Sequence, residues 1–180
     1  RVGLHLPHTR AAVVAALEGL PLDVTLHETT SGIAALLTGS RPGPTVLLRG
    51  DMDALPLQED TGERCTSEID GAMHACGHDG HTAMLVGAAR VLADRRSELA
   101  GRVLFMFQPG EENGARGALH MLDEGLLDVP PHGVDGSPSP VTAAYALHLT
   151  PNAPTGVVVS RPGPLMASSD SITITVTGRG

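Results

Sequence analysis

The 180-residue sequence contains no lysine and no tryptophan, and aromatic residues make up only 2% of it. All 12 basic residues are therefore arginines, and 20 acidic residues bring the formal net charge to −8. A protein that neutralises phosphates needs a basic face, so this charge argues against a nucleic-acid partner. The scarcity of aromatic residues means that the core must be built from Ala, Val, Leu and Ile.

The sequence has only two cysteines, Cys65 and Cys76, which are too few for a disulfide framework. It also lacks any apolar run near the roughly 18 residues that a membrane span requires. The first residues, RVGLHLPHTR, have no apolar segment of the kind found in signal peptides. We therefore expect a cytoplasmic protein with no membrane partner. The length suits one domain with a real core.

Helix-like and strand-like patterns alternate along the chain. Helices are predicted over residues 10–20, 80–99 and 111–127. Strands are predicted over residues 22–28, 32–39, 45–50, 102–109, 141–150, 155–163 and 171–178, with a turn at 41–44 and a loop over 54–73. In the second helix, Asp79 is expected to cap the start, and Met84, Ala88, Val91 and Leu92 to share the apolar face. This order predicts an α/β layer architecture, whose ligands bind beyond the C-terminal ends of strands.

The stretch MHACGHDGH, residues 73–81, combines metal-ligand residue types with glycine. Cys76 alone could be a small buried apolar residue. A thiol beside imidazoles favours the thiolate, which binds metal or acts as a nucleophile, so Cys76 and His78 indicate a metal site. A closed structural zinc site is disfavoured because no paired ligand knuckle surrounds Cys65. His74 and His81 are interpreted as supporting polar residues.

Paired acids follow two of the predicted strands. Glu111 and Glu112 could be a solvated helix start, where acidic residues suit the helix dipole. The strand before them is continuously apolar, which favours a second interpretation: one carboxylate binds metal and the other is the general base for a water molecule. Asp51 and Asp53 could be a solvated strand end, or one of them could orient a ligand histidine.

His148 interrupts another apolar strand, in ALHLT. A lone core histidine is usually only hydrogen-bonded, so His148 becomes a candidate ligand through the company of the other motifs. Three of the predicted strands, over residues 45–50, 102–109 and 141–150, and the start of the second helix thus deliver polar groups to the same edge of the sheet. This coincidence carries the functional hypothesis.

Four stretches resemble the M20 metallopeptidase superfamily: RGDMDALPLQEDTG, MHACGHDGHTAMLVGAARVL, FQPGEENGARGALHMLDEGLL and RPGPLMASSDSITITVTGRG. Within it they resemble the amidohydrolase branch of hippurate hydrolases, N-acyl-amino-acid amidohydrolases and plant auxin-conjugate hydrolases. The resemblance spans nearly the whole chain from Thr45. It implies a zinc-peptidase-like three-layer α/β/α catalytic domain with a mixed central sheet, over residues 1–168. Residues 169–180 would be the first strand of an inserted α+β lid or dimerisation domain.

The resemblance also implies a site with two divalent metal ions, which could be Zn, Mn, Co or Ni. Cys76 would bridge the ions, His78 and His148 would complete one, and Glu112 would bind the other. Glu111 would be the general base and Asp53 the acid that supports a ligand. The family's first histidine is absent here, since that block reads Asp-Met-Asp, and the role of Asp51 stays open.

The expected function is hydrolysis of the amide bond of N-acyl amino acids or short peptides, by a homodimer when full length. Another M20 activity, such as aminopeptidase or desuccinylase, and a noncatalytic metal-binding protein are the alternatives. The family's final histidine ligand would lie beyond residue 180. We therefore expect these 180 residues alone to be inactive, and to bind metal weakly or at one position.

Overall fold

The computed structural model describes residues 1–114, 116–130, 138–168 and 172–179. In it, the apolar strand β4 (Ala100–Gln108) lies at the centre of a five-stranded sheet of order β1-β2-β4-β3-β5. The other strands are β1 (Leu22–Leu26), β2 (Ile33–Thr38), β3 (Arg41–Asp51) and β5 (Val141–Ala146). Strands β1, β2 and β4 pair antiparallel, whereas β3 runs parallel to both β4 and β5. The predicted mixed sheet is confirmed.

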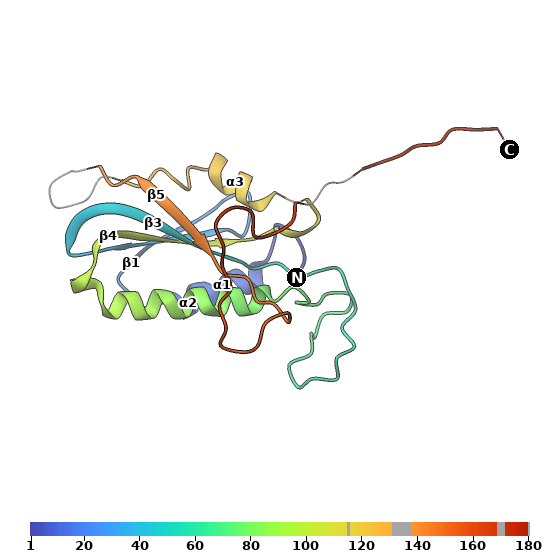
Figure 1. Cartoon of the computed structure of the whole chain (residues 1–180), viewed down its shortest axis with the longest axis horizontal. Helices are drawn as coiled ribbons and strands as arrows, with labels where there is room; N and C mark the ends of the chain where they lie inside the picture. Colours follow the sequence, from blue (N-terminus) through green and yellow to red (C-terminus); the bar gives the residue numbers. More distant parts are fainter. Residues whose placement is uncertain (115, 131–137, 169–171, 180) are drawn as a thin grey trace. The chain divides into compact units, whose positions relative to one another are not determined.

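Helices cover both faces of this sheet (Figure 1). Helices α1 (Pro7–Leu17) and α2 (His78–Asp94) lie on one face, and a 3-10 turn (Arg96–Glu98) follows α2. Helix α3 (Gly117–Asp123), preceded by a 3-10 turn (Glu112–Gly114), lies on the other. The predicted three-layer α/β/α architecture is confirmed.

The alternation of side chains in the central strands builds the two layers. Towards α1 and α2 the sheet buries Ile33, Ala35, Leu37, Phe105 and Phe107. Towards α3 it buries Ala34, Leu36, Leu47, Leu104 and Met106. Because successive side chains of a strand point to opposite faces, a continuously apolar strand is buried on both sides. This accounts for the uninterrupted apolar run of β4.

The path of the chain places the C-terminal ends of three strands together. Helix α2 connects β3 to β4, and α3 connects β4 to β5, which pairs with the opposite edge of β3. Crossovers between parallel strands are right-handed, so two crossovers that move in opposite directions along a sheet lie on opposite faces. Ligands bind where such a reversal occurs, outside the carboxyl ends of the strands.

Helix α2 begins two residues earlier than the sequence indicated. The prediction of its cap was wrong, and the prediction of its apolar face was right for Ala88 and Leu92, which pack against the core, but wrong for Met84 and Val91. Its N-cap residue is Gly77, whose φ of 79° is left-handed, and the carboxylate of Asp79 accepts the N–H of Gly80 instead of capping the helix. The left-handed turn at Gly77 starts the helix at His78 and sets its rotation. The buried face is therefore His78, His81, Leu85, Ala89 and Ala93, while Met84 and Val91 are exposed.

Other predictions along residues 1–149 also differ from the structure. The helix predicted over 10–20 is α1, from Pro7 to Leu17, and the strand predicted over 141–150 ends at Ala146. Residues 41–44 form the start of β3, with a register shift before Thr45, rather than a turn. The helix predicted over 111–127 begins only at Gly117. The reason is that Gly110 accepts the N–H of Gly117 in a wide turn, and Arg116 takes a left-handed φ of 56°.

The chain divides into two compact units, residues 1–149 and 150–180. In the second unit, the described residues 150–168 and 172–179 contain no strand, so the strand predicted over 155–163 was wrong. The lid-domain strand expected within 169–180 stays a prediction. The large apolar side chains of residues 172–179 are exposed; Ile172 is 85% exposed and Val176 is 88% exposed. A strand needs a neighbour for its backbone hydrogen bonds, and the described residues supply none. The domain boundary after residue 168 stays a prediction.

Across the residues that the structure describes, no helix is both long enough and apolar enough to cross a membrane.

Candidate metal centre

The first element of the site is the C-terminal end of β3. Asp51 is the last residue of this strand and pairs with Gln108 of β4, and Asp53 follows two positions later. Both aspartates are buried, each 1% exposed. A buried carboxylate needs partners, because an unpaired charge away from water is strongly unfavourable. The interpretation of the pair as a solvated strand end is therefore wrong.

The second element is the start of α2. The left-handed Gly77 separates Cys76 from His78, so the thiol lies in the loop and the imidazole in the first helical turn. His78 is 1% exposed, whereas Cys76 is half-buried. Helix α2 packs on β3, which brings both side chains to the strand ends.

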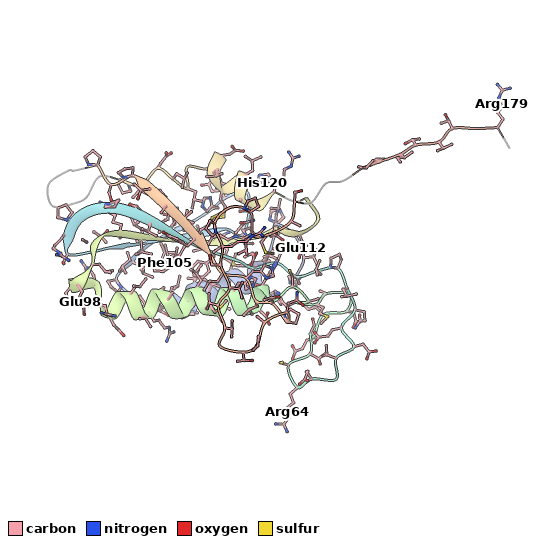
Figure 2. All side chains as sticks on the ribbon, viewed as in Figure 1. Arg64, Glu98, Phe105, Glu112, His120 and Arg179 are labelled. Carbon is pink, nitrogen blue, oxygen red and sulfur yellow. The ribbon has the colours of Figure 1, made fainter. Side chains whose placement is uncertain are left out.

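The third element is the turn after β4. The backbone N–H of Glu111 donates to Oδ1 of Asp53 at 3.0 Å, and that of Glu112 donates to Oδ2 at 3.1 Å. One carboxylate thus fixes the start of the turn that carries both glutamates. Glu112 lies at the end of the sheet where α2 begins, opposite the end marked by Glu98 (Figure 2).

The fourth element follows β5, which ends at Ala146. His148 lies two residues further on, and its Nε2 is 3.4 Å from Sγ of Cys76. Its Nδ1 donates to the carbonyl oxygen of Leu149 at 2.6 Å.

His78 is the common member of the groups that could hold a metal ion. In each group, one donor atom per residue lies within 4.8 Å of the others; the groups are Cys76, His78 and His148; Asp51, His78 and His81; and His78, Glu111 and Glu112. From Nε2 of His78 the distances are 3.6 Å to Oδ2 of Asp51 and 3.8 Å to Oε1 of Glu112. All the residues proposed from the sequence therefore converge on one place: Asp53, Cys76, His78, Glu111, Glu112 and His148.

These residues fit a metal ion on two grounds. Both ring nitrogens of His78 are buried and have no hydrogen-bond partner among the described residues. A buried polar atom without a hydrogen bond is costly, and a cation bound to one of these nitrogens would remove that cost at that atom. Donors about 2.0–2.3 Å from a tetrahedral ion lie roughly 3.3–3.8 Å apart, and the 3.4 Å between Cys76 Sγ and His148 Nε2 falls in this range.

The electrostatics of the site correct one sequence-based argument. Burial and the nearby carboxylates of Glu112, Glu111 and Asp51 raise the pKa of Cys76 to about 11. The imidazoles were expected to favour the thiolate, but burial and the carboxylates act in the opposite direction. A bound cation would favour the thiolate again.

The two buried partners His78 and Asp53 shift each other's pKa. Burial opposes a charge on His78, but the carboxylates of Asp53 and Asp51 outweigh burial and raise its pKa. Burial likewise opposes the charge on Asp53, but His78 and the N–H groups of Glu111 and Glu112 hold its pKa below the usual range. The site as a whole attracts positive charge.

Sequence reasoning missed the surroundings of Asp51. Its Oδ1 accepts Nδ1–H of His81 at 2.6 Å, and its Oδ2 lies 2.6 Å from Nη1 of Arg49. Nε2 of His81 in turn accepts the N–H of Leu149 at 2.9 Å. Arg49 and Asp51 are two positions apart in a strand, so the sequence could have indicated that their side chains point to the same face. The hydrogen bond from the backbone N–H of Leu149 to His81 could not be predicted from side-chain types.

Comparison with known proteins agrees with this geometry. Residues 47–180 match the model of peptidase family M20/M25/M40. The chain is 43% identical over 159 residues to N-acetylcysteine deacetylase of Bacillus subtilis, covering 88% of this chain and 38% of that relative. It is 36% identical over 179 residues to IAA-amino acid hydrolase ILR1-like 4 of Arabidopsis thaliana, covering 99% and 38% respectively.

A solved structure is similar as well. The crystal structure of the Bacillus subtilis YXEP protein, a dinuclear metal binding peptidase from the M20 family, superposes with a TM-score of 0.70 at 38% identity. The match covers 81% of this chain and 38% of that one. This chain thus spans about 38% of the length of each of these relatives. The motifs, the strand-end geometry and the family match together place the chain in peptidase family M20/M25/M40.

Proposed function

We propose that the protein is a metal-dependent amidohydrolase that cleaves the amide bond of N-acyl amino acids. The observation that carries the proposal is the convergence of thiol, imidazole and carboxylate donors on His78, from the ends of three strands and the start of α2. Buried titratable groups gathered at the switch point of an α/β sheet are where catalytic sites occur.

In this proposal, Cys76, His78, His148 and Glu112 together would hold two divalent ions. Thiolate, imidazole and carboxylate together suit Zn, Mn, Co or Ni. When bound, the ions would supply Lewis acidity that polarises the amide carbonyl and activates water.

Glu111 is the general base in this proposal. Its carboxylate belongs to the group with His78 and Glu112, and Glu111 is exposed, so water can reach it. It takes a proton from the attacking water as the oxygen bonds to the amide carbon. It then gives that proton to the nitrogen as the C–N bond breaks, releasing a carboxylic acid and an amine. Asp53 holds the turn that carries Glu111.

The names of the relatives support the substrate class. N-acetylcysteine deacetylase and the IAA-amino acid hydrolase are both named for substrates in which an acyl group is joined to an amino acid. The name of the YXEP structure keeps peptidase activity as the second candidate.

The proposal also includes a cytoplasmic homodimer. Both cysteines are free, as is usual in a reducing compartment, and light scattering of the full-length protein tests the dimer.

The test uses the full-length protein, stripped of metal and reloaded separately with Zn, Mn, Co or Ni. Hydrolysis of N-acetyl, N-benzoyl and N-succinyl amino acids is compared with hydrolysis of dipeptides. Glu111→Gln should abolish turnover while metal content stays unchanged, and Glu68→Gln, an exposed loop residue, is the matched control. Near-wild-type turnover of Glu111→Gln would remove Glu111 from its role. Faster dipeptide cleavage would favour the peptidase, and metal binding without hydrolysis would favour the noncatalytic alternative.

A further inference from the structure

We propose that Asp51 and His81 are positioning residues that hold His148 in place and keep its proton on Nδ1, so that Nε2 is the atom presented to the metal. The inference rests on the proposed function only in naming His148 as a ligand. Its physical content, the position and tautomer of His148, is independent of any metal.

The chain of contacts begins at a buried carboxylate. Asp51 lies beneath α2, where its Oδ1 meets Nδ1 of His81 at 2.6 Å and Oγ1 of Thr82 donates to its backbone carbonyl at 2.9 Å. The guanidinium of Arg49 contacts its other oxygen. Asp51 is 1% exposed and His81 is 3% exposed, so water does not compete for these bonds. Buried charge-assisted hydrogen bonds of this length are among the strong ones.

Each bond in the chain determines the direction of the next. A carboxylate only accepts, so Nδ1 of His81 carries the proton and Nε2 keeps its lone pair. The N–H of Leu149 only donates, and it donates to that lone pair at 2.9 Å. Both nitrogens of His81 are thereby satisfied within the protein. His81 thus acts through its neighbours rather than as a ligand.

The last bond reaches His148. The carbonyl oxygen of Leu149 only accepts, so Nδ1 of His148 donates to it and Nε2 faces Sγ of Cys76. A ligand histidine is oriented by the bond that its other nitrogen makes. His148 and Leu149 lie beyond Ala146, where the strand ladder of β5 ends. The hydrogen bond from Leu149 to His81 therefore holds the backbone in place beyond β5, as pairing with β3 does within β5.

A second contact holds Leu149 from its side-chain end. A Cβ at Gly80 would lie 2.4 Å from Cδ1 of Leu149, and one at Gly77 would lie 3.4 Å from its Cβ and Cδ1. The leucine thus sits directly on the first turn of α2, at positions without side chains. Gly80 has no left-handed φ, so space is the reason for glycine there. Packing and hydrogen bonding fix the same residue independently.

Two different substitutions should therefore disturb the position of His148 in the same way. His81→Ala removes the hydrogen bond, whereas Gly80→Ala keeps His81 and displaces Leu149. Gly87→Ala lies on the same helix, where a Cβ would meet nothing within 4 Å, and is the matched control. His81→Gln retains an acceptor for the N–H of Leu149 and is the conservative variant.

The decisive readout is the tautomer of His148 in the metal-free protein, measured by long-range ¹H–¹⁵N correlation of the imidazoles. We expect Nδ1–H in the wild type, in Gly87→Ala and largely in His81→Gln, and a mixture in His81→Ala and Gly80→Ala. The metal dissociation constant should rise about 10–100-fold in those last two variants. A wild type with Nε2–H at His148 would overturn the inference.

The inference would also be overturned if both lesions lowered the melting temperature but left the tautomer and the dissociation constant unchanged. That outcome would mean a purely structural role. A wild type that binds no divalent metal would contradict the proposed function, while the tautomer measurement would still decide this inference. If His81→Ala does not fold, Gly80→Ala against Gly87→Ala makes the same comparison.

Discussion

The carboxylate of Asp53 accepts the backbone N–H of Glu111 at 3.0 Å, across 58 positions of sequence. The same carboxylate accepts the N–H of Glu112 and lies 3.5 Å from Nδ1 of His78. One buried side chain therefore sets the mutual position of the proposed base, the proposed glutamate ligand and the central histidine.

Asp53→Asn should lower kcat by about 10–100-fold, the usual effect of losing a partner that orients metal ligands. The amide group keeps one acceptor but turns a donor towards an N–H, and it loses the charge beside His78. Steady-state kinetics and metal content check this. Asp23→Asn, at an exposed position of β1, is the control. Unchanged kcat and metal content in Asp53→Asn would contradict the account.

Gly117→Ala should destabilise the turn that joins β4 to α3. A Cβ at Gly117 would lie 1.6 Å from the carbonyl oxygen of Pro109, so the backbone must move. Overpacking of this kind costs about 1–3 kcal/mol. Thermal unfolding measures the loss, and Gly87→Ala should leave the protein as stable or more stable. Equal melting temperatures for Gly117→Ala and the wild type would show that the turn is softer than its contacts imply.

Phe105→Ala should cost about 3–5 kcal/mol of unfolding free energy, because removing a buried ring leaves a cavity. Phe105 is fully buried in the layer between the sheet and α2, and with 2% aromatic content few large side chains can compensate (Figure 2). Val91→Ala, on the exposed side of α2, should change stability by less than about 0.5 kcal/mol. Urea denaturation of both variants checks the contrast.

Glu124 should stabilise the loop between β1 and β2 in a pH-dependent way. Hydrogen bonds from the Thr29 hydroxyl and from the N–H groups of Glu28 and Thr29, with His27 nearby, lower its pKa from 4.5 to about 2. A carboxyl whose folded pKa is depressed stabilises the fold above its unfolded pKa and loses that contribution as pH falls.

The wild type should therefore melt higher than Glu124→Gln at neutral pH. Their melting temperatures should converge as pH falls from about 4.5 towards 2. Thermal melts across this range measure the difference. A constant gap down to pH 2, or no gap at pH 7, would contradict the role of Glu124.

Much of the fold follows from residue patterns alone. The uninterrupted apolar run of β4 indicated a strand buried on both faces, and helix–strand alternation indicated the α/β class. Where prediction failed, backbone geometry decided. Helix α2 starts earlier than predicted, and buries a different face, because Gly77 is left-handed. Helix α3 starts later than predicted because of the backbone conformations of Gly110 and Arg116. These are local conformations that side-chain periodicity does not encode.

The site residues that follow strands could be predicted from the sequence, whereas the contacts made by backbone atoms could not. Asp53, Cys76, His78, Glu111, Glu112 and His148 all reach one place, as their positions after apolar strands indicated. The partners of Asp51 and His81 were not foreseeable, because one of them is a peptide N–H. The raised pKa of Cys76 depends on carboxylates distant in sequence, so neighbouring imidazoles were a misleading guide.

The central claim is that side chains from the ends of three strands and the start of α2 bind divalent metal together. Anomalous diffraction from zinc-soaked crystals of the full-length protein, collected on both sides of the zinc edge, tests it most directly. We predict a peak within bonding distance of Cys76 Sγ, a ring nitrogen of His78 and His148 Nε2, with Glu112 bound to the same or an adjacent peak. Saturating zinc with no peak among these residues, or with peaks only elsewhere on the molecule, would contradict the account.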